Sequence, residues 1–263
     1  MMNSHTQTTS MAEIPNILLV DDNEEIIAYL TDILGEDYEL FVATHGEEAI
    51  ERLRNEAIHL VVSDIMMPVM DGLELCRRIK TDKAICHVPV ILLTAKDTIE
   101  SKIEGLETGA DAYIEKPVFP DYLRAQISNL LSNRRQLRSY FAGNPLVHME
   151  TISYTKADQL FLEKVSGFIL TNMDEVEMDL SAVAGEVNMS RMTLHRKIKA
   201  LTDMTPGDFV NLVRLRKSAE LLSEGSYKVY EVAFMTGFKS PAHFSKSFHR
   251  QFGFTPTQFV QNQ

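Results

Sequence analysis

The chain has 263 residues, of which 44% are hydrophobic and 24% are charged, and its 26 basic and 37 acidic side chains give a net charge of −11. This composition is typical of one large or two modest globular domains and excludes disordered, collagen-like and disulfide-rich chains. No apolar run approaches the roughly 18 residues needed to cross a bilayer, and the polar N-terminal stretch lacks the pattern of a secretory signal. The two cysteines, Cys76 and Cys86, lack metal-ligand spacing, so we expect ordinary thiols in a cytoplasmic protein without membrane contact.

Charge is divided unevenly along the chain. Residues 1–132 hold 10 basic and 24 acidic side chains, a net charge of −14, whereas residues 133–263 hold 16 and 13, a net charge of +3. From Leu180 onward there are 11 basic and 6 acidic side chains. A basic C-terminal part in an acidic chain indicates that the two halves meet different partners.

The boundary between the halves is marked by its residue types. Residues 133–151 carry clustered arginines followed by Gly143-Asn144-Pro145, which favours a turn over continued helix. We therefore expect a linker at 133–151, with a disordered segment at 1–13, a first domain at 14–132 and a second domain at 152–263.

In the first half, short apolar runs rich in β-branched residues alternate with amphipathic stretches. This alternation predicts an α/β domain with a doubly wound, five-stranded parallel sheet. The expected strands are 17–20, 40–43, 60–63, 88–93 and 112–114, and the expected helices are 23–34, 47–55, 72–80, 98–108 and 121–131.

Polar side chains follow four of these strands, namely Asp21, Asp22, Asp64, Thr94 and Lys116. Ligands of such sheets bind beyond the carboxyl ends of the strands, so we expect these side chains to converge. Carboxylates beside a lysine suit Mg²⁺ and a phosphoryl group. Asp64 is then the expected nucleophile of an aspartyl phosphate, with Lys116 and Thr94 on the phosphoryl oxygens. Taken alone, the first two acids are equally typical of an acidic helix start.

A phosphatase with an aspartate nucleophile is the enzyme alternative. That class usually needs Asp-x-Asp after its first strand, whereas this chain has adjacent Asp21 and Asp22 there and its candidate nucleophile after the third strand. We therefore expect no enzyme activity beyond assistance to the protein's own phosphorylation and dephosphorylation.

Four motifs in the first half match one family. LLVDDNEE at 18–25, VVSDIMMPVMDG at 61–72, LLTA at 92–95 and AYIEKP at 112–117 resemble the markers of two-component receiver domains. The resemblance covers about residues 14–132. Its fold is the doubly wound sheet expected above.

The receiver resemblance implies roles for individual residues. It implies that a histidine kinase phosphorylates Asp64. It also implies that Thr94 and Tyr113 form a switch pair, in which the hydroxyl moves toward the phosphoryl group and the ring packs inward behind it. The implied Mg²⁺ ligands are Asp22, Asp64, the Met66 carbonyl and, through water, Asp21.

The second half contains an internal repeat. Ala184 and Asn188 align with Ala233 and Gly237 at an offset of 49, and later positions align at an offset of 50. Each unit is typical of a helix, a tight turn and a second helix, because a small Ala lets helices approach and the turn residue tolerates positive φ. The repeat predicts an all-α domain with two helix-turn-helix motifs. The later aligned positions are Ser190, Leu194, Ile198 and Thr205 with Ser240, Phe244, Phe248 and Thr255.

The second helices of the two units, 190–200 and 241–252, have a core face and a basic face. An exposed basic face is usually only solvated. Its repetition in two units favours contact with phosphates and base edges in successive major grooves of duplex DNA. Zinc binding by His195 and His243 is disfavoured, because they lie in different units without cysteine partners. The outward side chains are Arg191, Met192, His195, Arg196 and Lys199 in the first helix and Ala242, His243, Ser245, Lys246 and His249 in the second.

At these residues the region from about 151 to 259 resembles an AraC-type DNA-binding domain, most specifically in VAFMTGFKSPAHFSKSFHRQFGFTP at 232–256. The resemblance implies that a long helix at about 206–222 holds the reading helices roughly one DNA turn, about 34 Å, apart. It places base contacts on Met192, His195, Arg196, Ala242, His243 and Lys246.

A receiver followed by this output resembles the C-terminal end of hybrid two-component regulators, in which a membrane sensor and kinase precede the receiver. We therefore expect a phosphorylation-controlled, sequence-specific transcription regulator, with activation the favoured sign and Mg²⁺ as cofactor. It would act in the cytoplasm or as the cytoplasmic end of a membrane-anchored hybrid sensor. The expected partners are double-stranded DNA, a histidine kinase in a separate or the same polypeptide, a second copy when phosphorylated, and RNA polymerase as a further candidate. The alternative is a phosphate sink or interaction module whose helical output does not bind DNA.

Overall fold

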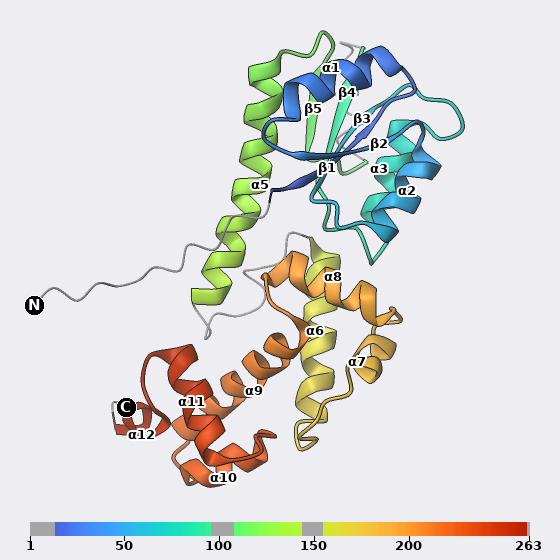
Figure 1. Cartoon of the computed structure of the whole chain (residues 1–263). Helices are drawn as coiled ribbons and strands as arrows, with labels where there is room; N and C mark the ends of the chain where they lie inside the picture. Colours follow the sequence, from blue (N-terminus) through green and yellow to red (C-terminus); the bar gives the residue numbers. More distant parts are fainter. Residues whose placement is uncertain (1–13, 96–107, 144–154, 262–263) are drawn as a thin grey trace, which may run out of the picture. The chain divides into compact units, whose positions relative to one another are not determined.

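The structure, a computed structural model, describes residues 14–95, 108–143 and 155–261 (Figure 1). By its contacts the chain divides into two units. One is Met1–Leu75 with Val90–Ala125, and the other is Cys76–Pro89 with Gln126–Gln263. In the described ranges every helix is too short or too polar to span a bilayer.

The first unit is built on a five-stranded, all-parallel sheet with strand order β2-β1-β3-β4-β5. Nearly all residues of β1, β3 and β4 are buried, which explains their continuous apolar runs. The expected fold class is confirmed. The strands are β1 (Asn16–Val20), β2 (Glu39–Ala43), β3 (Leu60–Asp64), β4 (Val90–Thr94) and β5 (Ala112–Glu115).

Helices connect these strands. Asn23 caps α1 by accepting a hydrogen bond from the Glu25 amide, and Arg124 of α5 donates to the Ile33 carbonyl of α1 at 2.7 Å. The helices α1 and α5 therefore lie side by side. The helix expected at 98–108 falls outside the described residues, apart from Thr108. The bounds are α1 (Glu24–Leu34), α2 (Gly46–Asn55), α3 (Gly72–Thr81) and α5 (Pro120–Gly143).

Several boundaries differ from those expected, and two of the differences have an evident cause. β4 begins at Val90 and not at Val88, directly after Pro89, which has no amide proton for a strand ladder. Residues 133–143, expected as the start of a linker, are the last turns of α5. The arginines at the start of this stretch therefore do not end the helix. Residues 1–13 and the rest of the expected linker, 144–151, lie outside the described residues.

The second half is helical, and its two similar parts share the central helix α9. This helix packs against α6 and α8 from the first part and against α10, α11 and α12 from the second. The expected all-α architecture is confirmed. The bounds are α6 (Lys156–Thr171), α7 (Leu180–Glu186), α8 (Arg191–Thr202), α9 (Pro206–Ser223), α10 (Val229–Met235), α11 (Pro241–Phe252) and α12 (Pro256–Gln261).

The repeat seen in the sequence is a repeat of backbone geometry. After α7 the amide of Met189 donates to the Ala184 carbonyl at 2.9 Å, and after α10 the amide of Phe238 donates to the Ala233 carbonyl at 3.0 Å. The turn residues Asn188 and Gly237 are left-handed, with φ of 56° and 74°. Both turns are therefore the same C-capping motif, in which a left-handed residue closes the helix end.

The following helices are also capped alike. Ser190 accepts a hydrogen bond from the Thr193 amide at 3.1 Å, and Ser240 accepts one from the His243 amide at 3.2 Å. Each hydroxyl satisfies an amide that has no partner within its helix. The turn and the cap together fix where each second helix starts.

Each part of the helical half has its own apolar core. The first core gathers buried residues of α6, α7 and α8 with Phe209, Val210, Leu212 and Val213 of α9. The second gathers Leu215, Ala219 and Leu222 of α9 with residues of α10 and α11. Leu194 and Phe244 occupy equivalent positions in the two cores, as the repeat predicts. The two cores meet at the middle of α9, between Val213 and Leu215.

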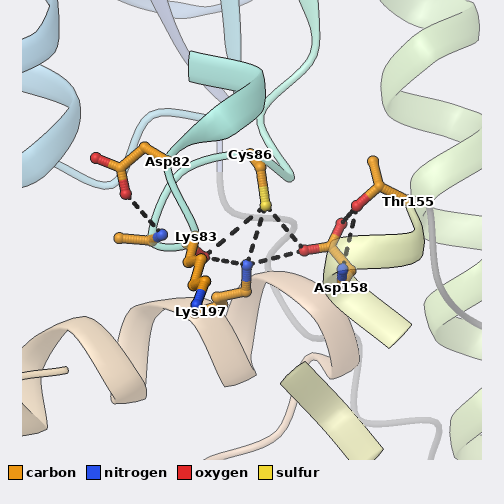
Figure 2. Close-up of polar contacts among 7 residues, drawn as sticks. Asp82, Lys83, Cys86, Thr155, Asp158 and Lys197 are labelled. Carbon is orange, nitrogen blue, oxygen red and sulfur yellow. Dashed lines mark hydrogen bonds and ion pairs between the residues drawn. The ribbon is translucent and has the colours of Figure 1, made fainter. Parts of the chain in front are cut away.

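A buried polar cluster lies in the second unit (Figure 2). Nζ of Lys197 on α8 is 2.9 Å from Oδ1 of Asp158 on α6, and the two side chains are 1% and 0% exposed. Lys197 also donates to the Lys83 carbonyl and to Sγ of Cys86, the latter at 3.3 Å. Thr155 accepts from the Asp158 amide and donates to its carboxylate. The buried ammonium is thus paired and hydrogen-bonded, as burial of a charge requires.

Candidate functional site

Three carboxylates meet at the carboxyl edge of the sheet. Asp21 follows β1 and Asp64 ends β3, the neighbouring strand, and both side chains are buried, while Asp22 is exposed. One oxygen from each of the three lies within 4.8 Å of the others. The convergence expected at the strand ends is therefore present.

Lys116, directly after β5, joins this cluster. Its Nζ is 2.8 Å from Oδ1 of Asp64 and 3.3 Å from Oδ2 of Asp21. Burial by itself would lower the pKa of Lys116, but the hydrogen bonds and charges of Asp64 and Asp21 together outweigh burial and raise that pKa. Burial raises the pKa of Asp21, against the opposing effects of the Asn23 amide and Lys116. Three carboxylates beside one cation leave the site with a net negative formal charge.

The loop after β3 presents Asp64 to this edge. The amide of Met66 donates to Oδ2 of Asp64 at 3.0 Å. Gly72 is required where the loop closes, because a Cβ there would lie 2.1 Å from the Asp64 carbonyl oxygen. Val69 in the same loop has a φ of 68°, which is strained for a β-branched residue. Both carboxylate oxygens of Asp64 are thus engaged, one by the loop and one by Lys116.

The expected switch residues lie on β4 and β5. Thr94 is buried at the end of β4, and its carbonyl accepts a hydrogen bond from the Lys116 amide at 2.8 Å. Tyr113 is half-buried on β5, with its hydroxyl 3.2 Å from the Thr108 hydroxyl. Met66 is exposed after β3. The switch roles of Thr94 and Tyr113 and the ligand role of the Met66 carbonyl stay predictions.

The acidic cluster has the donor set that Mg²⁺ requires. Mg²⁺ takes hard oxygen ligands, keeps several waters and binds through one or two carboxylates with phosphate oxygens. Exposed Asp22 leaves room for water, while Asp21 and Asp64 supply buried carboxylates beside it. The residues therefore fit this ion.

The expected reading helices α8 and α11 display the predicted side chains on their outer faces. Leu194 and Ile198 of α8, with Phe244 and Phe248 of α11, are buried in their cores. Of the expected base contacts, Met192, His195, Ala242, His243 and Lys246 are exposed and Arg196 is half-buried.

Two features of the helical half were missed at the sequence level. Lys197 of α8 was not expected to be buried, although its spacing of three from Leu194 and four from Leu201 places it on the inner face. Arg214 was assigned no role in the sequence, whereas it is 5% exposed within the bundle. Helical periodicity places both side chains on the inner face of their helices. A charged side chain is nevertheless normally expected to point to solvent.

Two family models match the chain. The response regulator receiver domain matches residues 17–128, and a helix-turn-helix domain matches residues 183–262. The chain joins a response regulator receiver domain to an AraC-type helix-turn-helix domain. These two domains are those of a two-component response regulator whose output is a helix-turn-helix domain.

Curated relatives share one or both parts. "Histidine kinase P4" of Formosa agariphila is 36% identical over 247 residues, 94% of this chain. "Response regulator Rre1" of Synechocystis is 37% identical over 54% of this chain, and the "Alkaline phosphatase synthesis transcriptional regulatory protein PhoP" of Bacillus subtilis is 38% identical over 44%. The matched regions are 18%, 62% and 48% of these proteins, so the chain spans less than two thirds of each.

Proposed function

We propose that this receiver accepts a phosphoryl group on Asp64 from a histidine kinase and thereby controls sequence-specific DNA binding by α8 and α11. The observation that carries the proposal is the position of Lys116, whose ammonium bridges Asp64 and Asp21 in a cluster of three carboxylates. This site stands in one chain with two matching helix-turn-helix units.

The chemistry follows from the side chains at the strand ends. A carboxylate oxygen of Asp64 attacks the phosphorus of a phosphohistidine, forming an O–P bond as the N–P bond breaks and the imidazole leaves with the electron pair. The ammonium of Lys116 and the hydroxyl of Thr94 stabilise the charge on the transferred phosphoryl oxygens. Bound Mg²⁺ supplies further charge neutralisation there. The residues that would hold it are Asp22, Asp64, the Met66 carbonyl and, through water, Asp21.

The signal is proposed to leave the site through Thr94 and Tyr113. Movement of the Thr94 hydroxyl toward the phosphoryl group would vacate space that the Tyr113 ring fills, which shifts the population of a second receiver conformation. That conformation favours a dimer and raises the affinity for the operator. The favoured result is activation of transcription, with RNA polymerase as a contact. The likeness to a protein called a histidine kinase supports a donor of that class, in the same or a separate polypeptide.

We assign base contacts to Met192, His195 and Arg196 of α8 and to Ala242, His243 and Lys246 of α11. Their support is that five of the six are exposed and Arg196 is half-buried, on capped helices that follow turns of the same motif. Replacing Arg196 with Ala should cost about 1–3 kcal/mol of operator binding and relax specificity at one base pair. Lys217→Ala removes an equal charge from a half-buried lysine of α9, which pairs with Glu220 at 2.8 Å, and serves as the control.

The test of the acceptor is phosphorylation by a small-molecule donor such as acetyl phosphate with Mg²⁺, followed by intact mass. Wild type should gain one phosphoryl group and Asp64→Asn none. Asp37→Asn, in the turn before β2, alters an exposed aspartate at the opposite edge of the sheet and should behave as wild type. Equal labelling of the Asp64 variant would contradict the assignment. A protein that is phosphorylated yet retains no duplex DNA would act as a phosphate sink or interaction module.

A further inference from the structure

Arg214 lies where the two helix-turn-helix parts meet. It is 5% exposed at the middle of α9, between Val213 of the first apolar core and Leu215 of the second. A charge at this position costs desolvation, and burial lowers the pKa of Arg214 despite the nearby Glu175 carboxylate. Such a cost calls for a compensating set of hydrogen bonds.

The guanidinium of Arg214 bonds to backbone of both parts. Its Nη1 donates to the Gly237 carbonyl at 3.2 Å and to the Val176 carbonyl at 3.4 Å, and its Nη2 donates to the Glu175 carbonyl. Glu175 and Val176 precede α7, the first helix of the first motif, whereas Gly237 is the turn of the second motif. A planar guanidinium presents its donors in a fixed fork, so it fixes the carbonyls relative to one another.

The contact between the parts is close at the same place. A Cβ on Gly237 would lie 2.3 Å from the Met173 carbonyl oxygen and 2.9 Å from Cζ of Arg214. The turn of the second motif therefore rests directly on the chain segment that follows α6. Gly237 lies only three residues before Ser240, which caps α11, so this contact also locates the start of α11.

A second link between the parts is solvent-exposed. Lys239 Nζ is 2.6 Å from Glu177 Oε1, with side chains that are 64% and 82% exposed. Exposed pairs of this kind contribute little, because water screens them. The pair thus offers a matched comparison with the buried arginine at the same junction.

We propose that Arg214 is a positioning residue for DNA reading, which fixes the offset between α8 and α11 and so sets the spacing between the two base sequences that one chain recognises. This rests on the proposed DNA contacts of α8 and α11. Arg214 itself touches no base in this account. Its effect should therefore depend on the distance between the two boxes and not on the sequence of either box.

The experiment measures the affinity of the full chain for a family of duplexes. Two boxes obtained by selection are placed at the preferred spacing and with one to three inserted base pairs, and further duplexes keep one box and scramble the other. Arg214→Met should lower the affinity for two-box DNA at the preferred spacing about tenfold, because one bound helix then holds the other less firmly over its own box. The loss of affinity caused by inserted base pairs should become smaller. Single-box affinity should stay unchanged. Glu177→Gln should keep the wild-type spacing profile.

Several outcomes would overturn the proposal. An unchanged spacing profile in Arg214→Met would remove the positioning role, and an equal loss on single-box and two-box duplexes would assign the residue to general stability. If Arg214→Met does not fold, Arg214→Lys keeps the charge without the fork and is measured in its place. Failure of both to fold would also assign Arg214 to stability. Absence of two-box binding by the wild type would instead count against the proposed function.

Discussion

The ammonium of Lys116 lies 2.8 Å from Oδ1 of Asp64, although 52 positions separate the two residues in the sequence. Parallel strands bring them together, because β3 and β5 flank β4 and all three end at the same edge. Lys116→Met should slow phosphorylation of Asp64 by about 10²-fold, since it removes a group that stabilises charge on the transferred phosphoryl. Time courses with acetyl phosphate measure this, and a wild-type rate would exclude the role.

Asp21 predicts a pH dependence of stability. Burial raises the pKa of Asp21 in the folded protein, so ionising Asp21 costs more free energy in the folded than in the unfolded chain. This contribution to stability is present below the unfolded-state pKa and is lost as the pH rises through the folded-state pKa. In Mg²⁺-free buffer Asp21→Asn should therefore be more stable than wild type near neutral pH. The difference should vanish at a pH below the unfolded value of 3.8, where both states are protonated.

Denaturant unfolding at a series of pH values tests this, and added Mg²⁺ provides the control. The cation favours ionised carboxylates, so it should narrow the gap between Asp21→Asn and wild type. A variant that is less stable than wild type at neutral pH without Mg²⁺ would contradict the account.

The buried pair of Lys197 and Asp158 predicts a large loss of stability. Asp158→Asn leaves an uncompensated ammonium in the core, which should cost about 3–5 kcal/mol. Glu186→Gln breaks the exposed pair with Lys164, at 3.3 Å, and should cost less than about 1 kcal/mol. Denaturant midpoints compare the two variants, and equal losses would mean that burial does not govern these pairs.

The two repeated turns predict unequal tolerance of alanine. Asn188→Ala replaces an asparagine, which tolerates the left-handed region, by an alanine at a φ of 56°. It should lower the free energy of unfolding by about 1 kcal/mol. Gly237→Ala places an alanine at a positive φ and also brings its Cβ against the Met173 carbonyl. The free energy of unfolding should fall by about 2–4 kcal/mol. Thermal and denaturant unfolding measure both, and similar costs would argue against the close contact at Gly237.

The sequence predicted most of the fold because local signals and the fold agree. The apolar runs predicted the strands of the sheet. The offsets of 49 and 50 predicted two motifs, and the hydrogen bonds of their turns and caps are equivalent. The convergence of Asp21, Asp64 and Lys116 followed from the rule that parallel strands end at one edge.

Features that depend on tertiary packing escaped prediction. Nothing local shows that Lys197 would find Asp158, or that Arg214 would find carbonyls 38 and 23 positions away. The length of α5 was underestimated, because its last turns are polar and resemble a linker by composition. The partners of Lys197 and Arg214 lie far away in the sequence, so local propensity cannot identify them.

The most direct test of the central claim is DNA affinity with and without a phosphoryl mimic. The full chain, with beryllofluoride and Mg²⁺ or with neither, is presented with random duplexes at near-physiological salt, beside Asp64→Asn. Wild type should enrich a motif spanning two adjacent major grooves, more strongly with the mimic, and the variant should not respond. Enrichment that the mimic leaves unchanged, or no enrichment of any duplex, would contradict phosphorylation-controlled DNA binding.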